Sequence, residues 1–170
     1  MKPRELAVGA LLTALALVIP LAFRGWLQVY FPVLGFSATL ASHVPSMLAM
    51  FIGPLVAAMV GIGSTIGFAV TLPPVIAARA ASHIVFAAAG AYLYRRGMSP
   101  AMVMAAVLPI HAILEGLAAW IFVQQWQAAA IVAGGTALHH VVDAIITLSV
   151  WAALARSGMD LGGRRPLRFR

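Results

Sequence analysis

The residues best suited to chemistry are ionisable side chains inside long apolar stretches. Arg79 and His83 are four residues apart within the run Pro73–His83, which places both on one face of a helix. An arginine inside a hydrophobic span is costly, so it usually pairs with another group or marks a functional site. Arg79 therefore has two open interpretations: a buried ion pair with Glu115 or Asp143, or a guanidinium that holds the carboxylate of a ligand.

Other ionisable residues share this apolar setting, and two pairs of them have helical spacing. His111 and Glu115 are four residues apart, as are His139 and Asp143. Each pair lies on one helix face and can satisfy itself within a helix bundle. Helical rise nevertheless brings polar groups of several helices to a similar depth. This convergence favours a site for a small anionic or heterocyclic aromatic ligand, made by Arg79, His83, His43, Glu115, His111, His139 and Asp143.

Two histidines have a competing structural interpretation. His43 stands two residues before Pro45, so its ring can bond a backbone carbonyl freed by the proline. His140 is turned by about 100° from His139 around the helix, which favours a packing role for it. His140 is therefore left out of the expected site.

The composition indicates a membrane protein. Of 170 residues, 63% are hydrophobic and only 9% are charged, whereas a soluble domain has about 25% charged residues. The net charge of +7 comes from scattered loop and terminal residues rather than one patch, so a lipid bilayer is the expected partner and nucleic acid is not. The chain has no cysteine, which excludes disulfide and thiolate chemistry.

The expected fold is all-α: one polytopic domain over residues 1–170 with six transmembrane helices. A helix needs about 20 apolar residues to cross a bilayer. The first apolar run is interpreted as a retained helix rather than a signal peptide. The predicted spans are 6–23, 35–51, 55–72, 74–94, 101–123 and 128–155, followed by a basic tail at 156–170. Gly63 and Gly67 have a spacing that lets a neighbouring helix approach closely.

The basic residues predict the orientation of these spans. Lys and Arg gather near the amino terminus, at Arg95 and Arg96, and in the tail, so both termini are expected in the cytoplasm of a multi-pass inner (cytoplasmic) membrane protein. Arg24 is the basic residue left for an outer loop, and the polar site falls in the outer half of the membrane. Trp26 and Tyr30 in that loop form either a lid over the site or an ordinary interfacial aromatic belt.

The first apolar run also carries a family resemblance. Its sequence Leu6-Ala-Val-Gly-Ala10-Leu-Leu-Thr-Ala14, ending at Pro20, resembles the first helix of substrate-binding S-components of energy-coupling factor vitamin transporters. Ala10 and Ala14 match the Ala-xxx-Ala motif of that family, and the length and six expected helices are also similar. The segment 35–51 and the later Arg79-Ala-Ala-Ser-His83 look similar to the niacin-type branch.

The resemblance implies a binding subunit rather than an enzyme. Such a subunit captures a vitamin, here one like nicotinate, and delivers it inward with a transmembrane coupling subunit and two ATPase subunits. Ala10 and Ala14 would form the docking face for the coupling subunit. No cofactor is expected in this chain, since ATP hydrolysis would occur in the partners, and the sequence has no Walker A phosphate loop.

Two other functions remain open. The histidines, Glu115 and Asp143 could serve a metal or proton-coupled transporter, although the cation of Arg79 in the same layer argues against a metal, and no metal site is expected. An intramembrane enzyme could use the His139/Asp143 or His111/Glu115 pair, but the sequence lacks the His-Glu-x-x-His and Gly-x-Ser-x-Gly motifs. A purely structural subunit would leave Arg79 unexplained.

Overall fold

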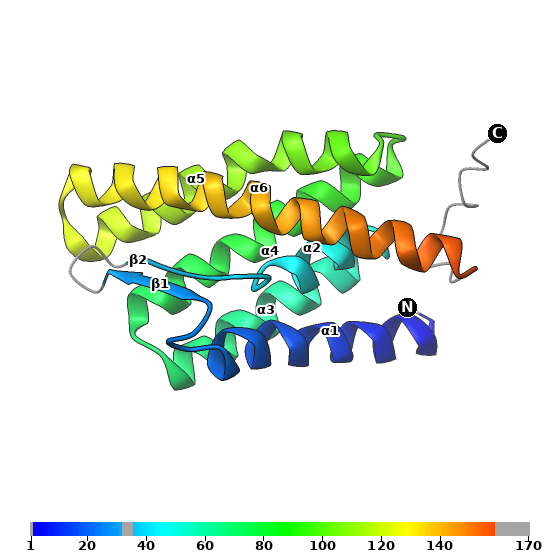
Figure 1. Cartoon of the computed structure of the whole chain (residues 1–170), viewed down its shortest axis with the longest axis horizontal. Helices are drawn as coiled ribbons and strands as arrows, with labels where there is room; N and C mark the ends of the chain where they lie inside the picture. The colour runs from blue at the N-terminus through cyan, green and yellow to red at the C-terminus, as the bar shows by residue number, and fades with distance from the viewer. Residues whose placement is uncertain (1, 32–35, 159–170) are drawn as a thin grey trace.

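A computed structural model describes residues 2–31 and 36–158 as a bundle of long antiparallel helices with one small β-hairpin (Figure 1). The elements are α1 (Pro3–Ala22), β1 (Gln28–Phe31), β2 (Phe36–Thr39), α2 (Val44–Met50), α3 (Pro54–Thr71), α4 (Pro74–Arg95), α5 (Pro100–Val123) and α6 (Trp126–Arg156). Five of the helices, α1 and α3 to α6, are long and apolar enough to cross a membrane. The predicted helical membrane domain is confirmed in this coarser form.

The prediction of one spanning helix over 35–51 is wrong. Residues Phe36–Thr39 form β2, which pairs antiparallel with β1 so that Phe31 lies opposite Phe36. The helix that follows, α2, has only 7 residues, and all of them are buried. The segment is apolar because it is enclosed by protein, and an apolar run this short is more typical of a core helix than of a membrane span. Six spans are therefore not confirmed among the described residues, and residue 35 lies outside them.

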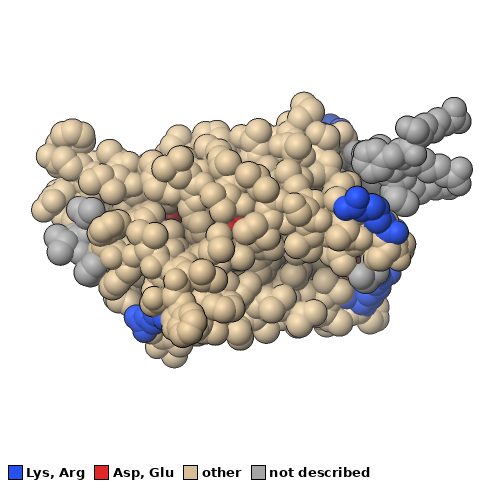
Figure 2. All heavy atoms as spheres, in the orientation of Figure 1, with Lys and Arg blue, Asp and Glu red and all other residues tan. Residues whose placement is uncertain are grey.

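The segment made of β2 and α2 determines at which end of the bundle the later helices begin and end. In Figure 1, β2 and α2 together carry the chain back along the bundle toward the start of α3, and α2 packs against α1, α3, α4 and α6. As a result, α1 begins, and α4 and α6 end, at the same end of the molecule. Most of the Lys and Arg surface lies at that end in Figure 2, with one basic group at the opposite end. The separation of charge agrees with the predicted topology, while the cytoplasmic side remains a prediction; residues 159–170 of the tail lie outside the described residues.

Small residues determine how closely α3 packs on its neighbours. A Cβ added at Gly63 or Gly67 would collide with the side chains of Thr13 or Leu17 on α1. This confirms the glycine pair as a contact between helices. Gly61, on another face of α3, lies against the backbone of α4 at Ile84.

Replacing Gly61 with alanine is expected to lower the free energy of unfolding by about 2–3 kcal/mol, the upper range for overpacking a close contact. The new Cβ would lie 2.7 Å from both Cα and N of Ile84, and backbone atoms cannot move aside as a flexible side chain can. Denaturant unfolding of the purified protein in detergent measures the loss. Gly134→Ala is the matched control, because no atom lies within 4 Å of its Cβ position. Equal midpoints for the two variants would contradict the close contact between α3 and α4.

Candidate functional site

A buried ion pair joins α4 to α5 in the centre of the bundle. Arg79 Nε and Nη2 donate to the same oxygen, Glu115 Oε2, at 3.0 and 2.6 Å. Nη2 also donates to the backbone carbonyl of Ser37 in the hairpin at 3.0 Å, and Thr136 donates its hydroxyl to Glu115 Oε2 at 2.7 Å. Of the two interpretations of Arg79, the ion pair with Glu115 is confirmed. The charge of Arg79 is thus largely compensated before any ligand binds.

The other oxygen of Glu115 faces a cluster of imidazole rings. The distances from Glu115 Oε1 to Nε2 are 3.3 Å for His111, 3.7 Å for His83 and 3.8 Å for His43. All four residues are buried. His43 directly precedes α2, whereas His83 comes from α4 and the other two from α5. The predicted convergence of polar groups from separate segments is therefore confirmed for these residues.

A second carboxylate, Asp143 on α6, fixes the turn that carries His43. Asp143 Oδ1 accepts from the backbone N–H of Ala41 at 2.8 Å, and Oδ2 accepts from that of His43 at 2.9 Å. Its Oδ2 also lies 3.2 Å from Nδ1 of His43 and 3.2 Å from Nε2 of His139. His139 Nε2 is 3.0 Å from the carbonyl oxygen of Thr39. The ring of His43 therefore bonds a carboxylate rather than a carbonyl freed by proline.

His140 contributes more than packing. Its Nδ1 lies 3.0 Å from Nδ1 of His111, and its Nε2 lies 3.0 Å from the carbonyl oxygen of Met104. The structure joins His140 to the polar network through His111, while its absence from the ligand site stays a prediction. The rotation of about 100° from His139 that moves it away from Asp143 turns it toward α5.

Replacing Asp143 with alanine is expected to cost about 3 kcal/mol of unfolding free energy, because two backbone N–H groups lose their acceptor at about 1–3 kcal/mol each. Hydrogen exchange should accelerate at the amides of Ala41 and His43, which Asp143 now protects. Ser149→Ala, on an exposed part of the same helix, is the control and should leave both measurements near their wild-type values. Unchanged protection at residues 41–43 would show that Asp143 does not hold this turn.

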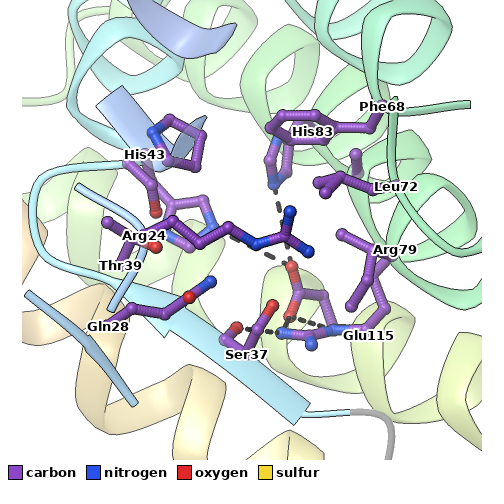
Figure 3. A pocket seen from close by; sticks show the side chains of 14 residues that line it. Arg24, Gln28, Ser37, Thr39, His43, Phe68, Leu72, Arg79, His83 and Glu115 are labelled. Atoms are coloured by element: carbon purple, nitrogen blue, oxygen red, sulfur yellow. Dashed lines mark hydrogen bonds and ion pairs between the residues drawn. The ribbon is translucent and has the colours of Figure 1, made fainter. Parts of the chain in front are cut away.

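A pocket opens next to the ion pair, between the end of α1, the hairpin and the turn from α3 to α4 (Figure 3). Its cavity volume is about 50 Å³, which is smaller than the about 300–1,000 Å³ of typical ligand pockets. Its lining is mainly polar toward the hairpin and apolar toward α3: Pro20, Arg24, Gln28, Ser37, Thr39, Ser42, His43, Phe68, Leu72, Ile76, Arg79, Ala80, His83 and Glu115.

Arg24 and Gln28 are pocket residues that sequence reasoning missed. The side chain of Arg24 extends across the pocket in Figure 3. Among residues 2–31 and 36–158, no hydrogen bond or ion pair involves its guanidinium. The sequence did hold a signal, since Arg24 was the single basic residue assigned to an outer loop. The pocket thus has one compensated guanidinium, Arg79, and one that is available to an anion, Arg24.

Comparison with known proteins adds one match. Over 96 residues the chain is 41% identical to a protein named Niacin transporter NiaX from Lactococcus lactis subsp. cremoris (strain MG1363). The chain is a homologue of a niacin transporter. The aligned part covers 56% of this chain and 41% of the relative, so the chain spans less than half of that protein's length. No family model and no solved structure matches the chain.

The homologue and the apolar helices together support a multi-pass membrane transport protein. Of the residues expected in its site, His43, Arg79, His83 and Glu115 line the pocket. The remaining ones lie beyond this lining and contact it through the polar network: the buried His111 and Asp143 and the partly buried His139.

The aromatic loop and the expected docking face lie at the surface. Tyr30 lines a small hollow that adjoins the pocket and shares Arg24 and Gln28 with it. Trp26 is 90% exposed and lines neither hollow, as expected for an interfacial belt. Ala10 and Ala14 are both exposed on α1.

Proposed function

We propose that this chain is the substrate-binding subunit of a niacin-type importer and that it captures nicotinate in the pocket beside Arg24. The observation that carries the proposal is the guanidinium of Arg24, which has no hydrogen bond or ion pair with the described residues and extends into a pocket lined by imidazole and amide groups. The homologue named for niacin transport supports the same substrate class. No catalytic step is proposed for the chain.

The pocket offers a separate partner for each part of nicotinate. Arg24 would bind the carboxylate through two charge-assisted hydrogen bonds. The side-chain amide of Gln28, which lines the same pocket, can donate to the pyridine nitrogen. Phe68 and Leu72 supply an apolar wall for the ring. In this arrangement Arg79 does not bind the ligand; it holds Glu115 and the hairpin carbonyl of Ser37 in place.

We further propose that transport depends on an energy-coupling module outside this chain, made of a transmembrane coupling subunit and two ATPase subunits. The exposed small residues Ala10 and Ala14 on α1 provide a face on which a partner helix can pack closely. The end of α1 and the first turns of α4 line the pocket, whereas Lys2 and Arg95 lie at the other ends of these two helices. By the positive-inside rule that supports a site in the outer half of the membrane.

Two measurements test this function. Isothermal titration of the purified chain in nanodiscs is expected to show nicotinate binding, with nicotinamide at least about tenfold weaker because it lacks the carboxylate. Cells that produce the chain should accumulate radiolabelled nicotinate only when an energy-coupling module is present. Absence of nicotinate binding would refute the substrate, and accumulation without the module would refute the proposed partners.

A further inference from the structure

The cluster around Glu115 Oε1 has the dimensions of a metal site. The Nε2 atoms of His111, His83 and His43 lie 3.3, 3.7 and 3.8 Å from that oxygen. One ligand atom from each of the four residues lies within 4.8 Å of all the others. In a tetrahedral zinc site with metal–ligand bonds of about 2.0–2.1 Å, neighbouring ligand atoms are about 3.4 Å apart. The three distances to Glu115 Oε1 are within a few tenths of an ångström of that spacing.

The outer partners of two of the rings fix their protons away from the cluster. His140 Nε2 faces the carbonyl of Met104, which only accepts, so a neutral His140 carries its proton there and accepts at Nδ1. His111 must then donate from Nδ1 to His140 Nδ1. His43 likewise donates from Nδ1 to Asp143. When these rings are neutral, the Nε2 atoms of His111 and His43 therefore carry lone pairs that face Glu115 Oε1.

These contacts match the way proteins hold metal-ligating histidines. Such a histidine nearly always donates its other ring N–H to a carboxylate, a carbonyl or a similar group, which fixes the ring and its tautomer. Asp143 serves His43 in this way, and His140 serves His111. Without a cation, two lone pairs and Glu115 Oε1 would repel one another inside the protein.

His83 gives an independent indication of a missing partner. Its side chain is only 7% exposed to solvent. Neither of its ring nitrogens has a hydrogen-bond partner among the described residues. Buried polar groups are nearly always satisfied, and a bound ion is one recognised reason for an exception. Its Nε2 atom faces Glu115 Oε1, the same carboxylate oxygen that the other two rings face.

The charge balance also permits a cation. Arg79 contacts Glu115 Oε2, whereas the imidazoles surround Oε1. Glu115 and Asp143 together carry two negative charges when ionised, against the single positive charge of Arg79. The sequence argued against a metal because Arg79 lies in the same layer. In the structure Arg79 contacts Oε2, on the other side of the carboxylate from the candidate metal site.

From this geometry we infer a binding site for a divalent transition metal of the zinc class, with His43, His83, His111 and Glu115 as its ligands. Three imidazoles and one carboxylate suit zinc, nickel or cobalt, whereas magnesium and calcium prefer oxygen ligands. The metal would form the floor of the pocket and hold α4, α5 and the start of α2 together. This inference goes beyond niacin transport and stands independently of it. A proton shared by the same four groups is the competing occupant.

The test uses the full chain in nanodiscs after removal of metal with a chelator, titrated with zinc and, separately, with magnesium. Zinc is expected to bind at one ion per chain, and magnesium should not bind. His83→Gln should weaken zinc binding by more than about 100-fold, beyond the loss typical when only an outer partner is removed. His139→Gln is the matched control. It removes a nearby histidine that is not one of the four ligands, and the glutamine keeps a donor for the carbonyl of Thr39. Its zinc affinity should stay within about tenfold of wild type.

The outcomes separate the alternatives. Wild-type protein that elutes as a folded species but binds no zinc, and only takes up a proton on acidification, would overturn the metal site. Equal zinc affinity in His83→Gln and His139→Gln would overturn the assignment of the four ligands. Nicotinate is titrated into the same preparations to distinguish the two proposals. A protein that binds nicotinate but does not bind added zinc refutes only the metal site. A protein that binds zinc but does not bind nicotinate refutes only the niacin function.

Discussion

Replacing Glu115 with leucine is expected to lower the free energy of unfolding by about 3–5 kcal/mol, the usual cost of removing one partner of a buried ion pair. Arg79, which is only 4% exposed, would lose the carboxylate that accepts from its Nε and Nη2. The hydroxyl of Thr136 would lose its acceptor at the same time. Denaturant unfolding of the protein in detergent, with helical content as the signal, measures the loss.

A double variant provides the control for this prediction. Replacing both members, as Arg79→Met with Glu115→Leu, removes the charge together with its partner, and such apolar exchanges are often close to neutral. The double variant should therefore recover most of the stability lost in Glu115→Leu. A single variant as stable as wild type, or a double variant less stable than the single, would show that the pair is not the main buried charge interaction of the bundle.

The second large effect is expected at Arg24. Arg24→Gln should weaken nicotinate binding by about 10- to 150-fold, because a hydrogen bond to a charged group contributes about 1.5–3 kcal/mol. The unfolding free energy should change by less than about 0.5 kcal/mol, since Arg24 is exposed and makes no hydrogen bond or ion pair with the described residues. Isothermal titration with nicotinate measures the affinity.

Two further variants control the role of Arg24. Arg24→Lys keeps the charge but loses the planar fork that binds a carboxylate through two bonds, so an intermediate affinity is expected. Arg96→Gln removes a positive charge beyond the far end of α4, where its guanidinium bonds Tyr92, and should leave nicotinate binding unchanged. Equal losses in Arg24→Gln and Arg96→Gln would indicate a general effect of charge rather than a contact in the pocket.

The long helices could be predicted from the sequence because their signal is local. A run of about 20 apolar residues specifies a membrane helix without reference to the rest of the chain. The segment 35–51 lacks such a local signal. Residues Phe36–Thr39 form a strand because they pair with Gln28–Phe31, and Asp143, a distant residue, fixes the turn after them. Apolar composition alone does not distinguish a segment buried in protein from one that faces lipid.

The depth of the site residues along their helices could be predicted from the sequence, but the rotation of each helix about its axis could not. Spacing along each helix placed His83, His111 and Glu115 at similar heights, and the structure brings them together. The choice of Glu115 over Asp143 as the partner of Arg79 depends on how α5 and α6 are turned about their axes. The sequence shows only that Arg24 follows the end of a helix, so it could be assigned to an outer loop and no further. Its place in the pocket depends on the hairpin that follows, which forms one wall of the pocket into which Arg24 extends.

The most direct test of the account is a cycle of two ligands and two proteins: nicotinate and nicotinamide, each titrated into wild type and Arg24→Gln. If Arg24 binds the carboxylate, wild type should prefer nicotinate by at least about tenfold, and that preference should nearly vanish in Arg24→Gln while nicotinamide affinity stays the same. An equal preference for nicotinate in both proteins would contradict the claim that Arg24 recognises the ligand in this pocket.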